Sequence, residues 1–262
     1  MNQLFAKLGR RLADYLSTPK RQGSHVAVVA PELLAAALRP GDVLLVEGNT
    51  RISVAIKYLT HSTWSHTALY IGDALGAPPA GEEPKVLIEA DLREGVRAVP
   101  LSLYSDMHTR ICRPAGLAPE DIQRVVRYAV ARIGHQYDMQ NVFDLARYLV
   151  PNPPVPARWR RRMLALGSGD PSRAICSTLI AQAFQSLPYP ILPDVTLEKS
   201  GDPLCKDCYR EVLRIRHHSL YTPRDFDISP YFEVVKPILA YDFDYHRLAW
   251  ADDSVALRPQ AH

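Results

Sequence analysis

Two segments that lie far apart in the sequence each place a reactive side chain at the beginning of an apolar run. In residues 64–72, His66 precedes a short apolar stretch that is typical of a buried strand. In residues 174–181, Cys176 begins a segment with the apolar spacing of an amphipathic helix. The chain is therefore expected to pack this helix on a buried strand, with the helix N-terminus pointing into a cleft.

A cysteine and a histidine in these positions suit nucleophilic catalysis. The attacking species is a thiolate, and a helix N-terminus and an adjacent imidazolium both lower the pKa of a thiol from about 8.5 to roughly 4 to 7. A rigid strand would hold the imidazole where it meets the sulfur. Taken singly, Cys176 is more often a small buried hydrophobe and His66 a structural or surface residue. The hypothesis therefore depends on the surrounding pattern.

Length and composition indicate one α+β domain with appended ends, because 262 residues with 47% hydrophobic side chains can bury a substantial core. Apolar runs predict a contiguous antiparallel sheet, and a last strand is expected near the end of the domain. The predicted strands cover residues 42–46, 67–71, 86–90, 96–99, 109–113 and 231–236.

Helical spacing predicts the elements between and around these strands. A short helical lead-in is expected over residues 26–39, and another helix begins at Pro119 and is closed by Gly134. A further helix is expected over about 140–149. The Cys176 helix ends at Pro188, and one of its sides carries Leu179, Ile180, Ala183, Phe184 and Leu187.

These patterns together resemble the circularly permuted papain-like hydrolases, and within them the YiiX-like branch of NlpC-type enzymes, which includes relatives of lecithin–retinol acyltransferase. The resemblance spans about residues 39–236, and His66 precedes Cys176, which is the order of the permuted branch. It implies a permuted papain-like α+β fold with an antiparallel sheet packed against the cysteine-bearing helix. The segments that carry it are 41–45, 52–59, 65–72, 87–90, 134–138, 176–180, 221–225 and 229–234.

The resemblance implies that Cys176 is the nucleophile, His66 the general base and Glu89 the residue that orients the imidazole. Glu89 also has an argument of its own, because it interrupts the apolar run 86–90 and a buried carboxylate is costly unless it is paired. Alternation along a strand equally permits a solvent-facing Glu89 or one at a strand end.

Other candidate substrate-binding residues are Trp64, Tyr58 and Arg160. The two aromatic side chains are candidate walls of the cleft, although aromatics at such positions are more often core. Arg160 lies in an arginine-rich run within 151–175, a loop that we interpret as a lid able to grip anionic groups. A solvated basic loop is the alternative.

The four cysteines are too few for a disulfide scaffold and suit a reducing compartment. Cys205 and Cys208 form half of a zinc signature, to which His217 and His218 would add ligands. A reversible thiol pair is another reading. Two reduced surface cysteines are favoured over both, and neither a metal nor a cofactor is expected. Residues 190–220, which contain this motif, are interpreted as a loop inserted before the last strand, and residues 241–262 as a C-terminal tail.

The formal net charge of +3 is small for this length and does not imply nucleic-acid binding. No run approaches the ~20 apolar residues that span a bilayer, and the N-terminal segment lacks the unbroken apolar stretch of a secretory signal. A cytoplasmic location is therefore expected.

Residues 1–25 interleave Lys7, Arg10 and Arg11 with apolar residues at helical spacing. Such a helix either lies on the inner face of a membrane or packs on its own domain or a partner.

The sequence thus predicts a domain over 26–240 that is a cysteine-dependent hydrolase or acyltransferase acting through a thioester. A lipid acyl substrate is slightly favoured by the N-terminal segment and the arginine-rich loop. The alternatives are an amidase or peptidase that cleaves peptide amides, such as cell-wall peptides, and a non-catalytic binding module. The sequence gives no indication of the oligomeric state.

Overall fold

The computed structural model describes residues 29–136, 175–199 and 208–237, together with Tyr15, Thr18, Asp244 and His246. The predicted N-terminal helix and C-terminal tail, the helix expected over 140–149, and the lid residues 151–174 lie outside the described residues.

A six-stranded sheet forms the centre of the fold, in the spatial order β4-β3-β2-β1-β5-β8. Every neighbouring pair is antiparallel, so the predicted antiparallel sheet is confirmed, and each predicted strand is found within one or two residues of its expected ends. The strands are β1 (Val43–Val46), β2 (His66–Tyr70), β3 (Lys85–Asp91), β4 (Gly95–Pro100), β5 (Thr109–Pro114) and β8 (Phe232–Val235).

The helices begin where the sequence supplies a residue suited to a first turn. Proline occupies the first position of α2 (Pro31–Ala37), α4 (Pro119–Val130) and α8 (Pro223–Asp227), where its missing N–H has no intrahelical partner to lose. The lead-in helix expected over 26–39 therefore begins later, at Pro31. The remaining helical elements are α3 (Arg51–Thr60), α7 (Ile175–Gln185) and the short turns η1 (Leu101–Tyr104) and η2 (His218–Leu220).

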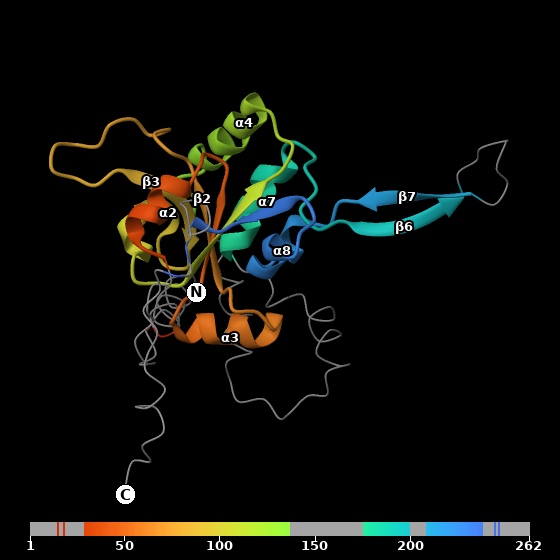
Figure 1. The fold of residues 1–262 in the computed structure, drawn as a ribbon, viewed down its shortest axis with the longest axis horizontal. Helices are drawn as coiled ribbons and strands as arrows, with labels where there is room; N and C mark the ends of the chain where they lie inside the picture. The colour runs from red at the N-terminus through yellow and green to blue at the C-terminus, as the bar shows by residue number, and fades with distance from the viewer. Residues whose placement is uncertain are drawn as a thin grey trace, which may run out of the picture.

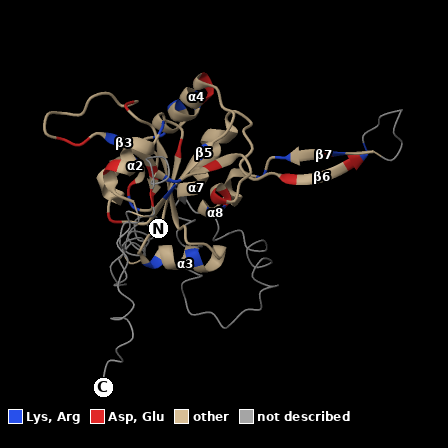
Figure 2. Ribbon diagram, in the orientation of Figure 1, with Lys and Arg blue, Asp and Glu red and all other residues tan. Residues whose placement is uncertain are grey.

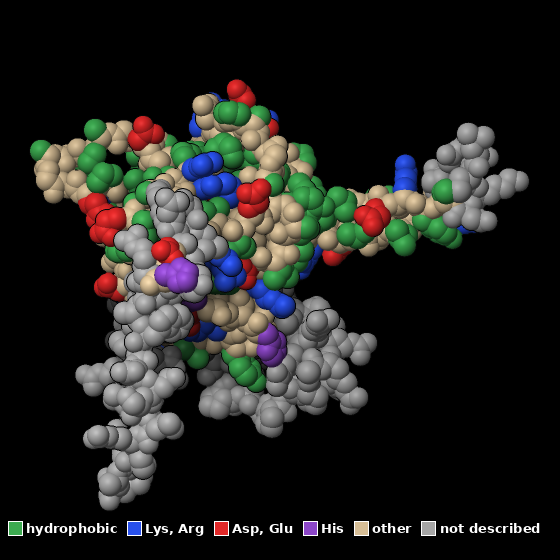
Figure 3. All heavy atoms as spheres, viewed as in Figure 1, with side chains coloured by type: hydrophobic (Ala, Val, Ile, Leu, Met, Phe, Trp, Pro, Cys, Tyr) green, Lys and Arg blue, Asp and Glu red, His purple; other side chains and the backbone are tan. Residues whose placement is uncertain are grey.

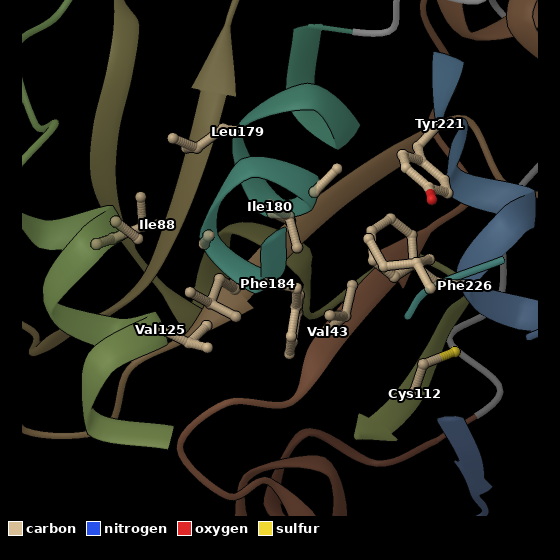
Figure 4. Close-up of a cluster of buried hydrophobic side chains, with 14 of the residues drawn as sticks. Val43, Ile88, Cys112, Val125, Leu179, Ile180, Phe184, Tyr221 and Phe226 are labelled. Atoms are coloured by element: carbon tan, nitrogen blue, oxygen red, sulfur yellow. The ribbon is translucent and has the colours of Figure 1, made fainter. Parts of the chain in front are cut away.

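Apolar side chains cover both faces of the sheet. On one face, α7 and α4 pack over sheet residues such as Val43 and Ile88, and Leu179 of α7 belongs to the same cluster (Figure 4). On the other face, α2 and η1 pack over a smaller cluster that includes Leu44 and Leu87. Because β1 is central and covered on both sides, all four of its residues are buried. The two-layer covering holds the strand ends of the sheet rigidly.

The segment 190–220 is not the loop that the sequence predicted. It forms an antiparallel hairpin of β6 (Asp194–Lys199) and β7 (Tyr209–Arg214), which projects from the rest of the molecule (Figure 1). The register runs from Asp194 opposite Arg214 to Lys199 opposite Tyr209, and an exposed ion pair joins Glu198 and Arg214 across the strands at 3.3 Å. Hydrophobic side chains are exposed along the hairpin (Figure 3). The alternation of apolar and polar residues in 194–199 was the available signal for a strand.

Acidic and basic side chains are interspersed over the described elements (Figure 2), in keeping with the small net charge of the chain. Among the helices described, none is long and apolar enough to cross a membrane.

Candidate active site

The structure brings together the three residues that the sequence singled out for catalysis. His66 is the first residue of β2, Glu89 lies in the middle of β3, and Cys176 lies in the first turn of α7. The strand register sets Glu89 opposite Ala68, so that His66, two residues before Ala68, lies diagonally across on the same face. Since α7 packs on β2 and β3, its N-terminus reaches the strand end that carries His66.

The imidazole of His66 is bound to the Glu89 carboxylate, with 2.5 Å between Nε2 and Oε2. Glu89 is only 2% exposed, so the sequence alternative of a solvent-facing carboxylate is wrong. Because Nε2 is occupied by the carboxylate, Nδ1 is the nitrogen left to interact with a thiol. The carboxylate therefore fixes both the ring orientation and the nitrogen that serves as the base.

Cys176 and His66 form an electrostatically coupled pair. Burial alone would raise the pKa of the Cys176 thiol, but the charge of His66 and hydrogen bonds with His66 and Thr67 lower it below its ordinary value. Burial would likewise lower the pKa of His66, but the charges of Cys176 and Glu89 raise it well above its ordinary value. The pair thus favours thiolate and imidazolium, the form in which a cysteine attacks.

Two further residues contact Glu89, and the sequence analysis did not identify them. Arg97 of β4 donates to Oε1, and the Tyr104 hydroxyl of η1 donates to Oε2. Burial would raise the pKa of Glu89, but His66, Tyr104 and Arg97 together lower it to about 2. The carboxylate is therefore ionised at any pH at which the protein is expected to work. Arg97 interrupts the apolar stretch of β4 as Glu89 interrupts that of β3, and this pair of opposite charges was a usable signal.

A cavity of about 260 Å³ opens beside these side chains. Apolar side chains from α3 and from the region of η1 form one part of its lining, and polar groups form another. Gly48 lines it where a Cβ atom would lie 2.3 Å from the Ser53 hydroxyl, so a larger residue would displace Ser53. Its lining also includes Ile52, Ile56, Leu103, Met107, Ser65, His66, Glu89, Asp91, Arg97 and Cys176.

The expected substrate-binding aromatics lie elsewhere. Trp64 is 2% exposed and packs in the core, with its indole N–H donating to Asp227 at 3.1 Å. Tyr58 is 60% exposed and is not among the described residues that line the cavity. It follows Ile56 by two positions on α3, about 200° around the helix, so the two side chains point in different directions. For both aromatics the expectation of a cleft wall is wrong; Arg160 lies outside the described residues.

The structure describes one of the two cysteines of the motif near the hairpin. Cys208, the described member of the motif, is disulfide-bonded, so the expectation of a reduced cysteine is wrong there and the thiol-pair reading is favoured. Within the described ranges, no three or more His, Cys, Asp or Glu side chains gather as a metal site would require.

The second and third strands of the antiparallel sheet carry His66 and Glu89, and the later helix α7 carries Cys176 in its first turn, which is the permuted papain-like α+β arrangement. Residues 37–148 match the model of the family described as permuted papain-like amidase enzyme, YaeF/YiiX, C92 family. This part of the chain is therefore similar to the permuted papain-like amidases of the YaeF/YiiX type. The matched range contains His66 and Glu89, and Cys176 follows it in the chain.

A solved structure is also similar to this chain. It is the crystal structure of metalloprotein YiiX from Escherichia coli O157:H7, with 17% sequence identity and a TM-score of 0.44. The similarity covers 76% of this chain and 97% of that chain. No curated protein matches the chain.

Proposed function

We propose that the protein is a cysteine amidase that cleaves an acyl–nitrogen bond through a thioester on Cys176. The observation that carries the proposal is the coupled set of Cys176, His66 and Glu89, in which each partner shifts the pKa of the next toward the charged form. The amide bond is supported by the description of the family that residues 37–148 match.

In the proposed reaction, the Cys176 thiolate attacks the acyl carbonyl carbon and forms a tetrahedral intermediate. The His66 imidazolium then donates its proton to the leaving nitrogen, the C–N bond breaks, and the acyl group remains on the sulfur as a thioester. Water attacks the thioester while His66 accepts its proton, and the acid product leaves as the thiolate is restored. Glu89 holds the imidazole throughout.

Stabilisation of the intermediate is assigned to the backbone. The N–H groups in the first turn of a helix have no intrahelical acceptor, and the Cys176 N–H lies in the first turn of α7. It is therefore the candidate donor to the oxyanion, with the positive end of the helix dipole behind it.

A lipid acyl substrate is the second candidate, with either water or another acceptor receiving the acyl group. It is supported by the apolar part of the cavity lining, which includes Ile52, Ile56, Leu103 and Met107, because an alkyl chain is stabilised by removal from water against such side chains. A related proposal is that the amphipathic segment 1–25 contacts the inner face of a membrane. The interleaving of Lys7, Arg10 and Arg11 with apolar residues supports it.

Mass spectrometry of the intact protein tests the acyl-enzyme directly. The purified chain is incubated with pools of acylated peptides and of phospholipids, and an added acyl mass is mapped to a residue. We expect an adduct on Cys176 that is absent from Cys176→Ser. The pool that yields it identifies an amide or a lipid ester. An intact chain that gives no adduct with either pool, and turns over neither, would favour a non-catalytic binding module.

A further inference from the structure

Glu89 is the middle residue of a row that crosses three strands. The register places Ala68 of β2 on one side of it and Arg97 of β4 on the other. Side chains directly opposite in neighbouring antiparallel strands lie on the same face. Arg97 is therefore held beside Glu89 by the backbone of the sheet itself, as His66 is from the other side.

The two carboxylate oxygens of Glu89 have separate partners. Oε1 accepts a hydrogen bond from Arg97 Nε at 2.8 Å, and Arg97 Nη2 forms an ion pair with the same oxygen at 2.7 Å. Oε2 accepts from His66 Nε2 at 2.5 Å and from the buried Tyr104 hydroxyl. Arginine presents its donors in a rigid planar fork, so Oε1 is fixed in place and Oε2 is held toward the imidazole.

Arg97 is itself anchored on its far side. Its Nη1 binds Glu94 at 2.8 Å, and its Nη2 lies 3.9 Å from Asp91. Tyr104 remains a donor because burial and the charge of Glu89 both raise the pKa of its hydroxyl. Two donors therefore bind the carboxylate that orients His66, namely the positively charged Arg97 and the neutral Tyr104 hydroxyl. Both have few alternative orientations.

We propose that Arg97 and Tyr104 are positioning residues that hold the Glu89 carboxylate, and through it the His66 imidazole, in the orientation that Cys176 requires. This inference rests on the proposed function, because it assigns the two residues to the same reaction. Neither residue is assigned a contact with the substrate. They act through Glu89.

The charged groups around His66 determine how removal of Arg97 or Tyr104 changes the reactivity of Cys176. The groups that face it are Cys176 from α7, Glu89 from β3 and Tyr104 from η1, with Arg97 of β4 behind the carboxylate. Without Arg97, the negative charge of Glu89 is no longer offset, which disfavours a thiolate nearby. Without either residue, the imidazole is also less often in place to stabilise the thiolate. Both effects raise the pH at which Cys176 becomes reactive.

The test measures the rate of Cys176 alkylation by iodoacetamide as a function of pH, which needs no substrate. We expect Arg97→Gln to move the midpoint upward by on the order of one pH unit. Tyr104→Phe should move it less, since no charge is lost. With the substrate that acylates Cys176, kcat should fall on the order of 10-fold to 100-fold in both variants while KM changes little.

Arg97→Lys separates charge from geometry and serves if Arg97→Gln does not fold. It keeps the positive charge but lacks the fork, so the alkylation midpoint should move less than in Arg97→Gln while kcat still falls. If Arg97 were only structural, the alkylation midpoint and kcat would not respond differently to Arg97→Lys.

The chain offers a matched control for each variant. Arg113 also binds a buried carboxylate at two points, with Nε 2.9 Å from Asp42 Oδ1 and Nη2 2.7 Å from Oδ2, in the same sheet and away from the cavity lining. The Tyr189 hydroxyl donates to two backbone carbonyls within the core. Arg113→Gln and Tyr189→Phe should lower stability and leave the alkylation midpoint unchanged.

The outcomes separate this inference from the proposed function. If wild-type Cys176 is reactive at low pH but both Arg97→Gln and Tyr104→Phe keep its profile and its kcat, the two residues are structural and the inference is wrong. An upward shift in the control variants of the same size would overturn it too. If wild-type Cys176 reacts no faster than an ordinary thiol, it is the proposed function that fails.

Discussion

At the level of single residues, two buried cysteines show how strongly the surroundings control the pKa of a thiol. Burial and the charge of Asp227 raise the pKa of Cys112 to about 12, although Arg110 opposes this. Cys176 is also buried, at 5% exposed, yet the charge of His66 and hydrogen bonds with His66 and Thr67 lower the pKa of its thiol. Two buried thiols are therefore expected to differ in reactivity because of the cation beside one of them.

Selective alkylation is the first prediction. A limiting dose of iodoacetamide at about pH 6 should modify Cys176 before Cys112, because below the ordinary thiol pKa of about 8.5 only a thiol with a lowered pKa is substantially thiolate. Peptide mapping by mass spectrometry reads the site. His66→Ala should erase the preference, since the imidazolium provides the stabilising charge. Equal labelling of Cys176 and Cys112 in the wild type would count against the nucleophile.

The second prediction concerns the division of roles. Cys176→Ser and His66→Ala should abolish turnover, whereas Glu89→Gln should leave a residual kcat, reduced on the order of 10²-fold to 10⁴-fold, because Glu89 orients the base without forming a bond to substrate. Circular dichroism should show all three variants folded. Wild-type turnover in Glu89→Gln would show that another group orients His66, and an unfolded Glu89→Gln would show that the carboxylate is mainly structural.

At the level of elements, α7 has two functions, because its N-terminus carries Cys176 and its inner side fills the core. Phe184 is fully buried on this side and packs edge-on against Phe232, with ring centroids 5.2 Å apart. The orientation of Cys176 therefore depends on core packing several residues further along the same helix.

Truncation of this side chain is the third prediction. Phe184→Ala should reduce the free energy of unfolding by about 3 to 5 kcal/mol, through lost burial and the cavity that remains. Chemical denaturation measures it. The control is Leu197→Ala on the hairpin, where the side chain is 66% exposed and the change should stay within about 0.5 kcal/mol. Comparable losses in both variants would show that the hairpin is part of the cooperative core.

The elements that the sequence predicted well are those whose pattern is local. The apolar runs of β1 to β5 and the proline that begins α4 are recognisable without knowing the fold. Cys176, His66 and Glu89 each begin or interrupt an apolar run, and it is the resemblance to the permuted papain-like hydrolases that assigns them their roles. Arg97 and Tyr104 were missed because their role depends on the register of β3 with β4 and on the position of η1. Register is a tertiary property that no single strand encodes.

The other errors of the sequence prediction also arise from tertiary structure. Trp64 lies two residues before His66 but outside β2, so the alternation of the strand does not place its side chain beside His66, and it packs in the core instead. The hairpin over 194–214 was overlooked because a two-stranded ribbon buries few apolar side chains, so its strands lack the apolar runs that mark the central sheet.

At the level of the whole molecule, α7 separates the candidate site from the projecting hairpin. Cys176 lies in its first turn, and Gln185 at its last residue donates to the backbone carbonyl of Arg216, just beyond β7. An eleven-residue helix spans about 16 Å. The candidate site and the base of the hairpin therefore lie at opposite ends of α7, and the membrane contact proposed above belongs to another part of the chain.

The fourth prediction tests such contact through the N-terminal segment. An amphipathic helix that carries Lys7, Arg10 and Arg11 should draw the protein to anionic vesicles by apolar burial plus about 1 kcal/mol for each basic residue near the surface. Sedimentation with anionic vesicles should therefore exceed that with neutral ones, weaken with added salt because the charge attraction is screened, and drop when residues 1–20 are removed. The truncated chain should still cleave a soluble substrate, because the residues that line the cavity begin at Val46. If the full-length chain does not sediment with anionic vesicles at low salt, the membrane proposal fails, and the lipid candidate then rests on the cavity lining alone.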